Sequence, residues 1–429
     1  MLTFSQFKPY KDLPLNIYLV GGAVRDKLLN RTVKDHDFLV VGATSEQMLT
    51  LGFIAVGKDF PVFLHPKTKA EFALARTERK QGKGYTGFTC YAAPDVTIEE
   101  DLLRRDLTVN AMAMSSDGKI IDPYGGQQDL REKALRHVSP AFSEDPLRVL
   151  RVARFAARYH SLGFSVANET NQLMNKIAAS GELATLSAER LWQEMSQSLV
   201  DNNAEVFFQV LRNCQALQQL WPELDNLWGI PNPAKWHPEI CSGIHTMMVL
   251  QQACLLTQNG SEGLAIRFAA LCHDLGKGLT PASKYPSHQG HEKSGLALVE
   301  KACKQFKVPN KIEKLALLVC EYHLHCHKVF ELKASTILKI FNALDIWRNP
   351  SQLTDFLLCC EADFRGRLGL EINPYPQAKY FTECAENALE VNAKEFIAQG
   401  IQGANIKEAM NNDRIKAIEQ TKQKWAIVK

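Results

Sequence analysis

Short apolar runs bounded by turn residues dominate the first third of the chain. Four of them have the length and the β-branched or aromatic content of strands: 16–20, 37–41, 61–65 and 71–76. A helical stretch at 23–29 follows the pair Gly21-Gly22, and the run IIDPYGG closes the region at 120–126. The pattern predicts a small mixed α/β domain over residues 1–140.

Beyond this region the apolar positions recur with the spacing of helices. A proline-containing stretch, GIPNPAKWHP at 229–238, reads as a linker. We therefore predict an α+β chain with four parts: the mixed domain, a helical neck and body, a histidine-rich helical domain, and a helical C-terminal region, over residues 1–140, 141–228, 229–345 and 346–429.

Composition narrows the class of protein. With 429 residues, 45% of them hydrophobic and 23% charged, the chain has ordinary globular usage and room for several domains. The net charge of +3 leaves a local basic face possible. No apolar run approaches the roughly 18 residues of a membrane span, the start lacks the order of a signal peptide, and the 11 cysteines include no C-x-x-C pair. We expect a cytoplasmic protein without membrane contact.

Candidate phosphate and metal groups gather in the mixed domain. The turn Gly21-Gly22, with Arg25 at the start of a helix, has the features of a phosphate-binding turn. Asp35 and Asp37 stand two residues apart at the head of a strand, so their side chains face the same way. Such a pair suits a divalent metal, or it is simply a solvated turn. Glu71, which opens another predicted strand, is our candidate for a third carboxylate.

Arginines mark the next two motifs. The segment DLLRRDLTVNA at 101–111 contains Arg104, Arg105, Asp106 and Asn110. The segment EDPLRVLRVARFAAR at 144–158 then places four arginines on one helical stripe: Arg148, Arg151, Arg154 and Arg158. Because only Glu144 and Asp145 accompany the stripe along its own helix, we expect unpaired guanidinium groups that suit phosphates and base edges.

Histidine marks the third predicted part of the chain. Eight of the 12 histidines fall between residues 237 and 327. The candidate metal ligands are His245, His273, Asp274, His291, His323 and Asp363. Imidazole and carboxylate groups together suit a transition metal or Mg²⁺ that activates water. We expect His288 to be exposed, and His325 and His327 to be either substitute ligands or bystanders.

At this point a family resemblance is evident. The motifs GGAVRD, DHD, RRDLTVNA and EDPLRVLR, in this order, resemble those of the bacterial tRNA nucleotidyltransferases, the CCA-adding enzymes of the class shared with bacterial poly(A) polymerases. The similarity extends over essentially the whole chain and is greatest to the multifunctional gammaproteobacterial type with an appended HD domain.

The resemblance implies a role for each matching residue. Asp35 and Asp37 would be catalytic and hold two Mg²⁺ ions, while the phosphates and ribose of the nucleotide would contact Gly22, Arg25, Arg105, Arg151 and Arg154. Asp145 and Arg148 would read the base edge of CTP and then ATP without a nucleic-acid template. The stretch 79–88 resembles a mobile loop that helps to change the specificity from C to A. The implied partners are CTP, ATP and the acceptor arm and 3′ end of tRNA, for a monomer or a homodimer.

The histidine pattern resembles that of HD-domain phosphohydrolases. This likeness implies a metal site of His245, His273, Asp274, His291, His323 and Asp363, with His273 and Asp274 catalytic. The metal would be Ni²⁺, Mn²⁺ or Mg²⁺, and the substrates 2′,3′-cyclic phosphates, 2′-nucleotides and simple phosphates. Leu324 stands where this family often has aspartate.

Three other functions remain open at the level of sequence. A poly(A) polymerase would share the first four motifs. That class usually has a basic C-terminal extension, whereas the excess of basic over acidic residues in 400–429 of this chain is modest. An RNA-binding protein with a purely structural HD domain would not need the complete order of ligands. A nucleotidyltransferase acting on a small molecule would lack the long helical body.

Overall fold

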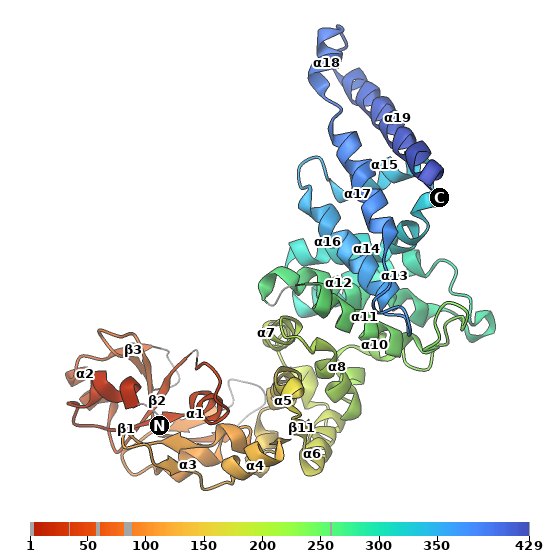
Figure 1. Cartoon of the computed structure of the whole chain (residues 1–429). Coiled ribbons are helices and arrows are strands. Elements are labelled where there is room, and N and C mark those ends of the chain that lie inside the picture. Colours follow the sequence, from red (N-terminus) through yellow and green to blue (C-terminus); the bar gives the residue numbers. More distant parts are fainter. Residues whose placement is uncertain (1–3, 34, 57–60, 81–87, 258–259, 429) are drawn as a thin grey trace. The chain divides into compact units, whose positions relative to one another are not determined.

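A computed structural model describes residues 4–33, 35–56, 61–80, 88–257 and 260–428. The chain forms two compact units (Figure 1). Unit 1 comprises the residues up to Leu191 together with Val206–Leu220, and unit 2 comprises Trp192–Glu205 together with the residues from Trp221 onward. Each unit is described by itself.

Unit 1 is built on a seven-stranded sheet in the order β3-β4-β5-β2-β1-β8-β9. These strands are β1 (Asn16–Val20), β2 (Asp37–Val41), β3 (Ile54–Val56), β4 (Val62–Leu64), β5 (Glu71–Leu74), β8 (Ala113–Met114) and β9 (Ile120–Ile121). The strands predicted at 16–20, 37–41, 61–65 and 71–76 are thus confirmed. The pair β2 and β5 is parallel, and the other neighbours are antiparallel.

The apolar runs form strands because their side chains fill one aromatic core. Phe38 on β2 stacks on Phe72 of β5 with ring centroids 4.8 Å apart, and Tyr10 packs edge-on against both rings. Helix α1 (Gly22–Leu28) buries Ala23 and Val24 in the same core. This packing holds the N-terminal end of β2, where Asp37 lies, next to the turn that precedes α1.

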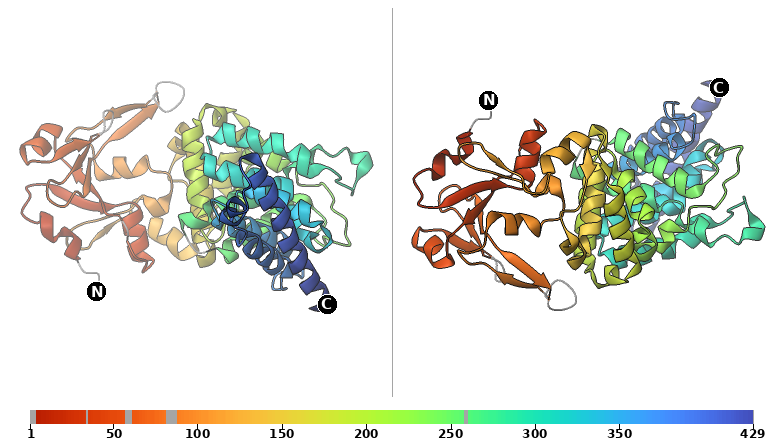
Figure 2. Two further views of the ribbon diagram at one scale, coloured as in Figure 1. Left: turned by 90° about the horizontal axis from the view of Figure 1, so that it is seen from above. Right: turned by 90° about the horizontal axis from the view of Figure 1, so that it is seen from below.

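A second, smaller ribbon stands apart from the main sheet. Strands β6 (Thr77–Lys80) and β7 (Phe88–Tyr91) pair only with each other within the described residues, as the two views of Figure 2 show. Of the loop predicted at 79–88, residues 79 and 80 belong to β6 and Phe88 begins β7. Residues 81–87 lie outside the described residues.

The rest of unit 1 is mainly helical. Its helices are α2 (Ser45–Thr50), α3 (Ile98–Leu103), α4 (Gly126–Glu132), α5 (Leu147–Tyr159), α6 (Asn168–Ala179) and α9 (Ala216–Leu220). Strands β10 (Ala134–Leu135) and β11 (Ser165–Val166) form a short parallel pair. The chain crosses between the units within α7 (Ala188–Leu199) and α8 (Ala204–Asn213).

From Trp221 onward, the described residues of unit 2 form helices joined by turns, with one isolated β-bridge between Pro231 and Cys241. Its helices are α10 (Pro222–Asp225), α11 (Ser242–Leu256), α12 (Leu264–Cys272), α13 (His291–Phe306), α14 (Asn310–His327), α15 (Ala334–Leu344), α16 (Ser351–Arg365), α17 (Pro376–Leu389), α18 (Ala393–Ala398) and α19 (Ala404–Val428). Helix α12 packs against α11, α14 and α16, and residues from Ile266 to Cys272 are all buried. They include Arg267, whose Nη1 donates to the carbonyl oxygens of Leu199 and Asp201. Within the described residues, no helix combines the length and apolar character of a membrane span.

Candidate active sites

A cleft of about 780 Å³ in unit 1 gathers every candidate residue predicted in the N-terminal part of the chain. We call it the head cleft. The predicted residues that line it are Gly22, Arg25, Asp35, Asp37, Glu71, Arg105, Asp145, Arg148, Arg151 and Arg154. They come from turns, strand ends and two helices, α1 and α5, that are far apart in the sequence. The cleft therefore brings carboxylates and guanidinium groups together around one volume.

The carboxylates of the head cleft lie at the ends of two neighbouring strands. Asp37 begins β2, Glu71 begins β5, and the two residues are direct partners in the parallel register. Side chains paired in this way extend from the same face of the sheet. Loss of hydration in the cleft raises the pKa of Asp37; the Arg105 guanidinium opposes that shift and the Asp35 carboxylate adds to it. A bound cation would relieve this cost, and all-oxygen donors suit Mg²⁺.

The glycine turn before α1 is tightly packed. Gly21 has a φ of 68°, and a Cβ added there would lie 2.8 Å from Nη1 of Arg105. Arg25 is buried beneath the turn: its Nη1 donates to Oδ1 of Asn110 and its Nε donates to Asp26 over 2.9 Å. The ring of Tyr159 lies 4.8 Å below the guanidinium. These contacts fix Arg25 in one orientation.

Buried aspartates hold the arginines that follow. Asp101, fully buried, pairs with Arg104 at 2.6 Å and with Arg105 at 3.2 Å. Burial alone would raise the pKa of Asp101, but the two guanidinium groups hold it below its ordinary value. Nε of Arg105 is buried and has no hydrogen-bond partner among the described residues. Arg105 therefore still has a donor available for a ligand.

The expectation of unpaired arginines on α5 was wrong. Arg151 pairs with the buried Asp106 at 2.7 Å, and Arg148 donates to the carbonyl oxygens of Ala141 and Arg104 over 2.9 and 2.7 Å. These acceptors belong to other segments, so the pattern along the helix could not reveal them. The stripe is a set of cations whose positions the surrounding fold fixes.

Asp145 lies just before α5 and has a partner that the sequence did not indicate. Its Oδ2 accepts a hydrogen bond from Nη2 of Arg190 over 2.9 Å, and its Oδ1 accepts from the backbone N–H of Leu147 over 3.1 Å. Arg190 also lines the head cleft. An arginine 45 residues away leaves no local signal in the sequence.

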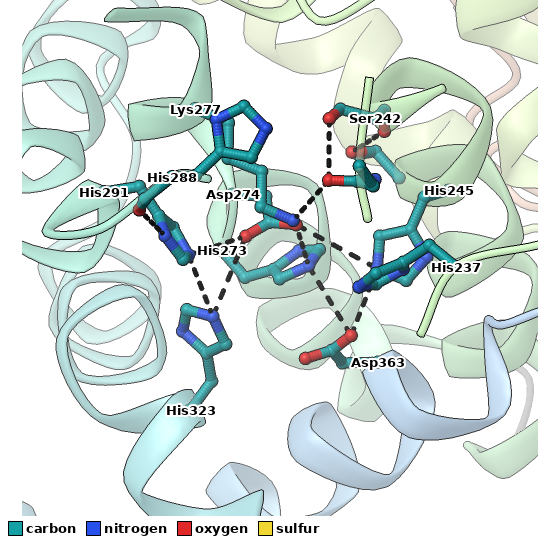
Figure 3. Close-up of polar contacts among 12 residues, drawn as sticks. His237, Ser242, His245, His273, Asp274, Lys277, His288, His291, His323 and Asp363 are labelled. Carbon is teal, nitrogen blue, oxygen red and sulfur yellow. Dashed lines mark hydrogen bonds and ion pairs between the residues drawn. The ribbon is translucent and has the colours of Figure 1, made fainter. Parts of the chain in front are cut away.

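In unit 2, the six predicted ligands converge from four helices and one helix end (Figure 3). We call this set the histidine centre: His245, His273, Asp274, His291, His323 and Asp363. All six are buried. A close approach makes this possible: a Cβ on Gly276 would collide with the carbonyl of His291, so glycine lets the segment after Asp274 lie directly against the start of α13.

All four histidines of the centre have a backbone carbonyl as a hydrogen-bond partner at Nδ1; for His245 it is the carbonyl of Gly366, at 3.2 Å. His273, His291 and His323 each donate Nδ1–H to a backbone carbonyl, of Ala270, His288 and Val319, over 2.7, 2.7 and 3.0 Å. The lone pair of each neutral ring is therefore on Nε2, the atom that points into the centre. Burial lowers the pKa of His323 to about 3, so this ring is neutral at neutral pH.

The candidate ligand atoms of the centre form two groups, and Asp274, a member of the second group, also lies next to His273 of the first. Potential ligand atoms of His245, His273 and Asp363 lie within 4.8 Å of one another, as do those of Asp274, His291 and His323. Oδ2 of Asp274 is 3.1 Å from Nε2 of His273, and its Oδ1 is 3.0 Å from Nε2 of His291. Nevertheless, Nε2 of His273 and Oδ1 of Asp274 make no hydrogen bond with suitable geometry within the described residues. Buried, converging and unsatisfied atoms of these types fit one or two divalent metal ions.

Several residues around the histidine centre were missed or misjudged in the sequence. His288 is buried rather than exposed as expected, because its ring bonds Thr280 and the carbonyl of Pro231. His327 contacts Asp363 at 2.6 Å, while His325 belongs to none of the three ligand groups found among the described residues, the third being His237, Glu239 and His245. Lys277 is 2.6 Å from Asp274. Glu239, close to Nδ1 of both His237 and His245, was not singled out because it is a lone glutamate in a linker-like segment.

Comparison with known families assigns most of the chain. Residues 17–136 match the family described as the poly A polymerase head domain, residues 163–227 the probable RNA and SrmB-binding site of polymerase A, and residues 243–346 the HD domain. The first match contains Asp35, Asp37 and Glu71 of the head cleft, and the third contains all of the histidine centre except Asp363.

Curated relatives and solved structures agree with this assignment. A protein named multifunctional CCA protein from Pasteurella multocida is 57% identical over 95% of this chain and 97% of its own length. One of the same name from Vibrio cholerae serotype O1 is 59% identical over 94% of this chain and 100% of its own length. The solved Thermotoga maritima CCA-adding enzyme complexed with tRNA has a TM-score of 0.65 at 18% identity, covering 99% of this chain and 93% of that one. At that identity the structural likeness concerns the fold.

Proposed function

Because the chain belongs to the family of the multifunctional CCA proteins, we propose that it adds and repairs the 3′-terminal CCA of tRNA from CTP and ATP without a template. The observation that carries this proposal is the head cleft, where carboxylates at two strand ends face a set of fixed arginines. The reaction joins the 3′-hydroxyl of tRNA to the α-phosphate of the nucleotide and releases pyrophosphate. Both the nucleotidyltransferase domain that contains the head cleft and the HD domain are metal-dependent.

The head cleft divides this work between carboxylates and cations. Asp35 and Asp37, with Glu71 as a third ligand, would hold Mg²⁺. Two bound metal ions supply activation of the attacking hydroxyl and neutralisation of charge on the leaving pyrophosphate. Arg105, Arg151 and Arg154 would hold the nucleotide in place, while Gly22 and Arg25 shape the turn beside its phosphates. Since these groups are fixed before substrate binds, little reorganisation opposes the reaction.

Selection of the base would fall to Asp145 and Arg148. Cytosine and adenine each present an amino group beside a ring nitrogen, and therefore one donor next to one acceptor. A carboxylate has lone pairs beyond those used by Arg190 and Leu147 and can accept from either amino group. One pair of side chains then serves both nucleotides, which is what addition without a template requires.

The histidine centre would make unit 2 a phosphohydrolase. The metal would be Ni²⁺, Mn²⁺ or Mg²⁺, held by His245, His273, Asp274, His291, His323 and Asp363. Their imidazole and carboxylate atoms converge in a buried volume, and Nε2 of His273 and Oδ1 of Asp274 have no hydrogen-bond partner there within the described residues. A metal bound there supplies an activated water and polarises the phosphate. The substrates would be 2′,3′-cyclic phosphates, 2′-nucleotides and simple phosphates, so the activity would clear damaged RNA ends.

Two further considerations support this assignment over its alternatives. The degree of identity to proteins named for CCA, over nearly their full length, favours CCA addition over poly(A) synthesis. The buried, unsatisfied ligand atoms favour a working HD centre over a structural one. We also propose a cytoplasmic location, which suits a tRNA substrate and a chain whose cysteines are unpaired.

One assay tests the proposal directly. Purified protein is incubated with tRNA lacking CCA, with CTP, ATP and Mg²⁺, and the product ends are sequenced. We expect C, C and A in order, followed by a stop. A long run of A would indicate a poly(A) polymerase, and no addition at all would contradict nucleotidyl transfer to RNA.

A further inference from the structure

A cavity of about 810 Å³ lies beside the histidine centre in unit 2. His291, a member of the centre, forms part of its wall. The charged residues that line it are three cations, Lys277, Lys328 and Arg367, and two glutamates, Glu292 and Glu331. Trp236 and Phe364 add two large aromatic rings. A ligand that fills such a cavity needs both an anionic group and a flat apolar group. A nucleotide has both.

Asn232 offers the cavity a donor that has no partner of its own. The residue is only 2% exposed. Its Oδ1 accepts hydrogen bonds from Oγ of Ser242 and Nζ of Lys277 over 3.1 and 3.0 Å, so the orientation of the amide is fixed. Nδ2 is buried and has no hydrogen-bond partner among the described residues. A buried donor held in this way is satisfied when a ligand brings an acceptor.

The acceptor that suits this position is a phosphate oxygen. Lys277, which bonds Asn232, lies 2.6 Å from Asp274 of the histidine centre (Figure 3). Nη2 of Arg367 is 3.7 Å from Asp363, and its Nε is buried without a hydrogen-bond partner within the described residues. An amide donor and two cations next to metal-ligating carboxylates match the charge and the acceptors of a phosphate ester.

Trp236 supplies the apolar part. It lines the cavity and yet is 59% exposed, which is unusual for so large an apolar side chain. The ammonium group of Lys235 lies 4.7 Å from the centre of its ring. Nucleobases stack on exposed aromatic rings with little dependence on their sequence. The ring is therefore suited to a base at the edge of the cavity.

We propose that this cavity is the nucleotide subsite of the phosphohydrolase, with Nδ2 of Asn232 donating to the phosphate and Trp236 stacking on the base. The inference rests on the proposed phosphohydrolase function of the histidine centre and names two residues that would set its preference among the proposed substrates. It follows that the enzyme prefers a nucleotide to a phosphate ester without a base, and that the preference depends on Trp236.

The test compares two substrates across a small set of variants. Hydrolysis of adenosine 2′-monophosphate and of glycerol 2-phosphate is measured with the same metal for the wild type, Trp236→Ala, Trp236→Phe and Asn232→Asp. Trp347→Ala, which removes a half-buried tryptophan outside this cavity, is the matched control. Metal content and tRNA extension are measured for each variant, so that a folding defect is recognised.

We expect Trp236→Ala to raise KM for the nucleotide about tenfold, and KM for glycerol 2-phosphate by less than about twofold. Trp236→Phe should restore most of the nucleotide affinity. Asn232→Asp keeps the acceptor for Ser242 and Lys277 but removes the donor, and should raise KM for both substrates about tenfold. Trp347→Ala should change neither KM.

Two results would overturn the subsite: an equal effect of Trp236→Ala on both substrates, or unchanged KM values in Asn232→Asp. A wild-type protein that hydrolyses neither substrate with any of the metals would instead refute the proposed phosphohydrolase function, and this inference with it. The two failures are therefore distinguishable.

Discussion

The head cleft and the histidine centre use opposite arrangements of charge. In the head cleft the carboxylates Asp35 and Asp37 are exposed, and the fixed groups are arginines held by Asp101 and Asp106. In the histidine centre the proposed metal ligands themselves are buried and oriented, each histidine by a bond at Nδ1. We infer that the head is built to hold a large anionic substrate that contributes metal ligands of its own. The centre is built to hold the metal first.

The largest effect should come from breaking the head cleft alone. Asp37→Ala removes a carboxylate that would hold Mg²⁺, and we expect CCA addition to fall by about 10³-fold or more. Phosphohydrolase activity should stay at the wild-type level, because the ligands of the histidine centre belong to unit 2. Labelled CTP incorporation into tRNA measures the first activity. Asp413→Ala, at a half-exposed aspartate on α19, is the control. Loss of both activities in Asp37→Ala would contradict two separate sites.

The reciprocal variant is His273→Ala. It removes a buried Nε2 from the convergence point of the centre, and hydrolysis of 2′,3′-cyclic AMP should fall by about 10²-fold or more. Addition of CCA should continue unchanged. Both rates are measured on one preparation, with metal content determined in parallel. An unchanged hydrolysis rate would mean that the histidine centre is not catalytic.

A smaller effect should separate selection of the nucleotide from chemistry within the head cleft. Asp145→Asn retains an oxygen for the N–H of Leu147 but places an amide where the base edge would donate. We expect discrimination against UTP and GTP to weaken by about 10- to 100-fold, with a smaller loss in the rate of addition. Sequencing of products made from equal mixtures of four nucleotides measures this. Ordered addition of only C, C and A by the variant would rule out the role of Asp145.

The two sites also differ in how far the sequence could predict them. Local sequence patterns were enough to predict the strand positions, the pair Asp35 and Asp37, and the order of the histidines. Strand alternation and helix periodicity are local properties of a sequence. The partners that fix these groups are distant in the sequence. Asp106 pairs with Arg151, Arg190 pairs with Asp145, and the ring of His288 hydrogen-bonds the carbonyl of Pro231. Such contacts arise from tertiary packing and leave no trace in the local sequence. The sequence of α5 alone therefore predicted unpaired arginines, although other segments of the fold provide their hydrogen-bond acceptors.

A substitution of Glu239 should have the smallest effect of those considered, and it tests whether the histidine centre is organised before metal binds. Its Oε1 lies 3.0 Å from Nδ1 of His245 and 2.8 Å from Nδ1 of His237, and these two histidines hold its pKa well below the ordinary value against the effect of burial. Glu239→Gln keeps an oxygen there but removes the charge that strengthens His245 as a ligand. We expect metal affinity to fall by about 10- to 100-fold.

The measurement is a titration of metal-free protein with Ni²⁺, followed by hydrolysis rates at saturating metal. Because Glu239 acts through His245 and not on the substrate, kcat at saturation should stay close to the wild-type value while the metal concentration needed rises. Glu408→Gln on α19 provides an exposed control. A different result would be a lower kcat at saturating Ni²⁺ with an unchanged affinity for Ni²⁺. Glu239 would then be acting on the substrate, and our inference that this centre binds metal before substrate would lose its support.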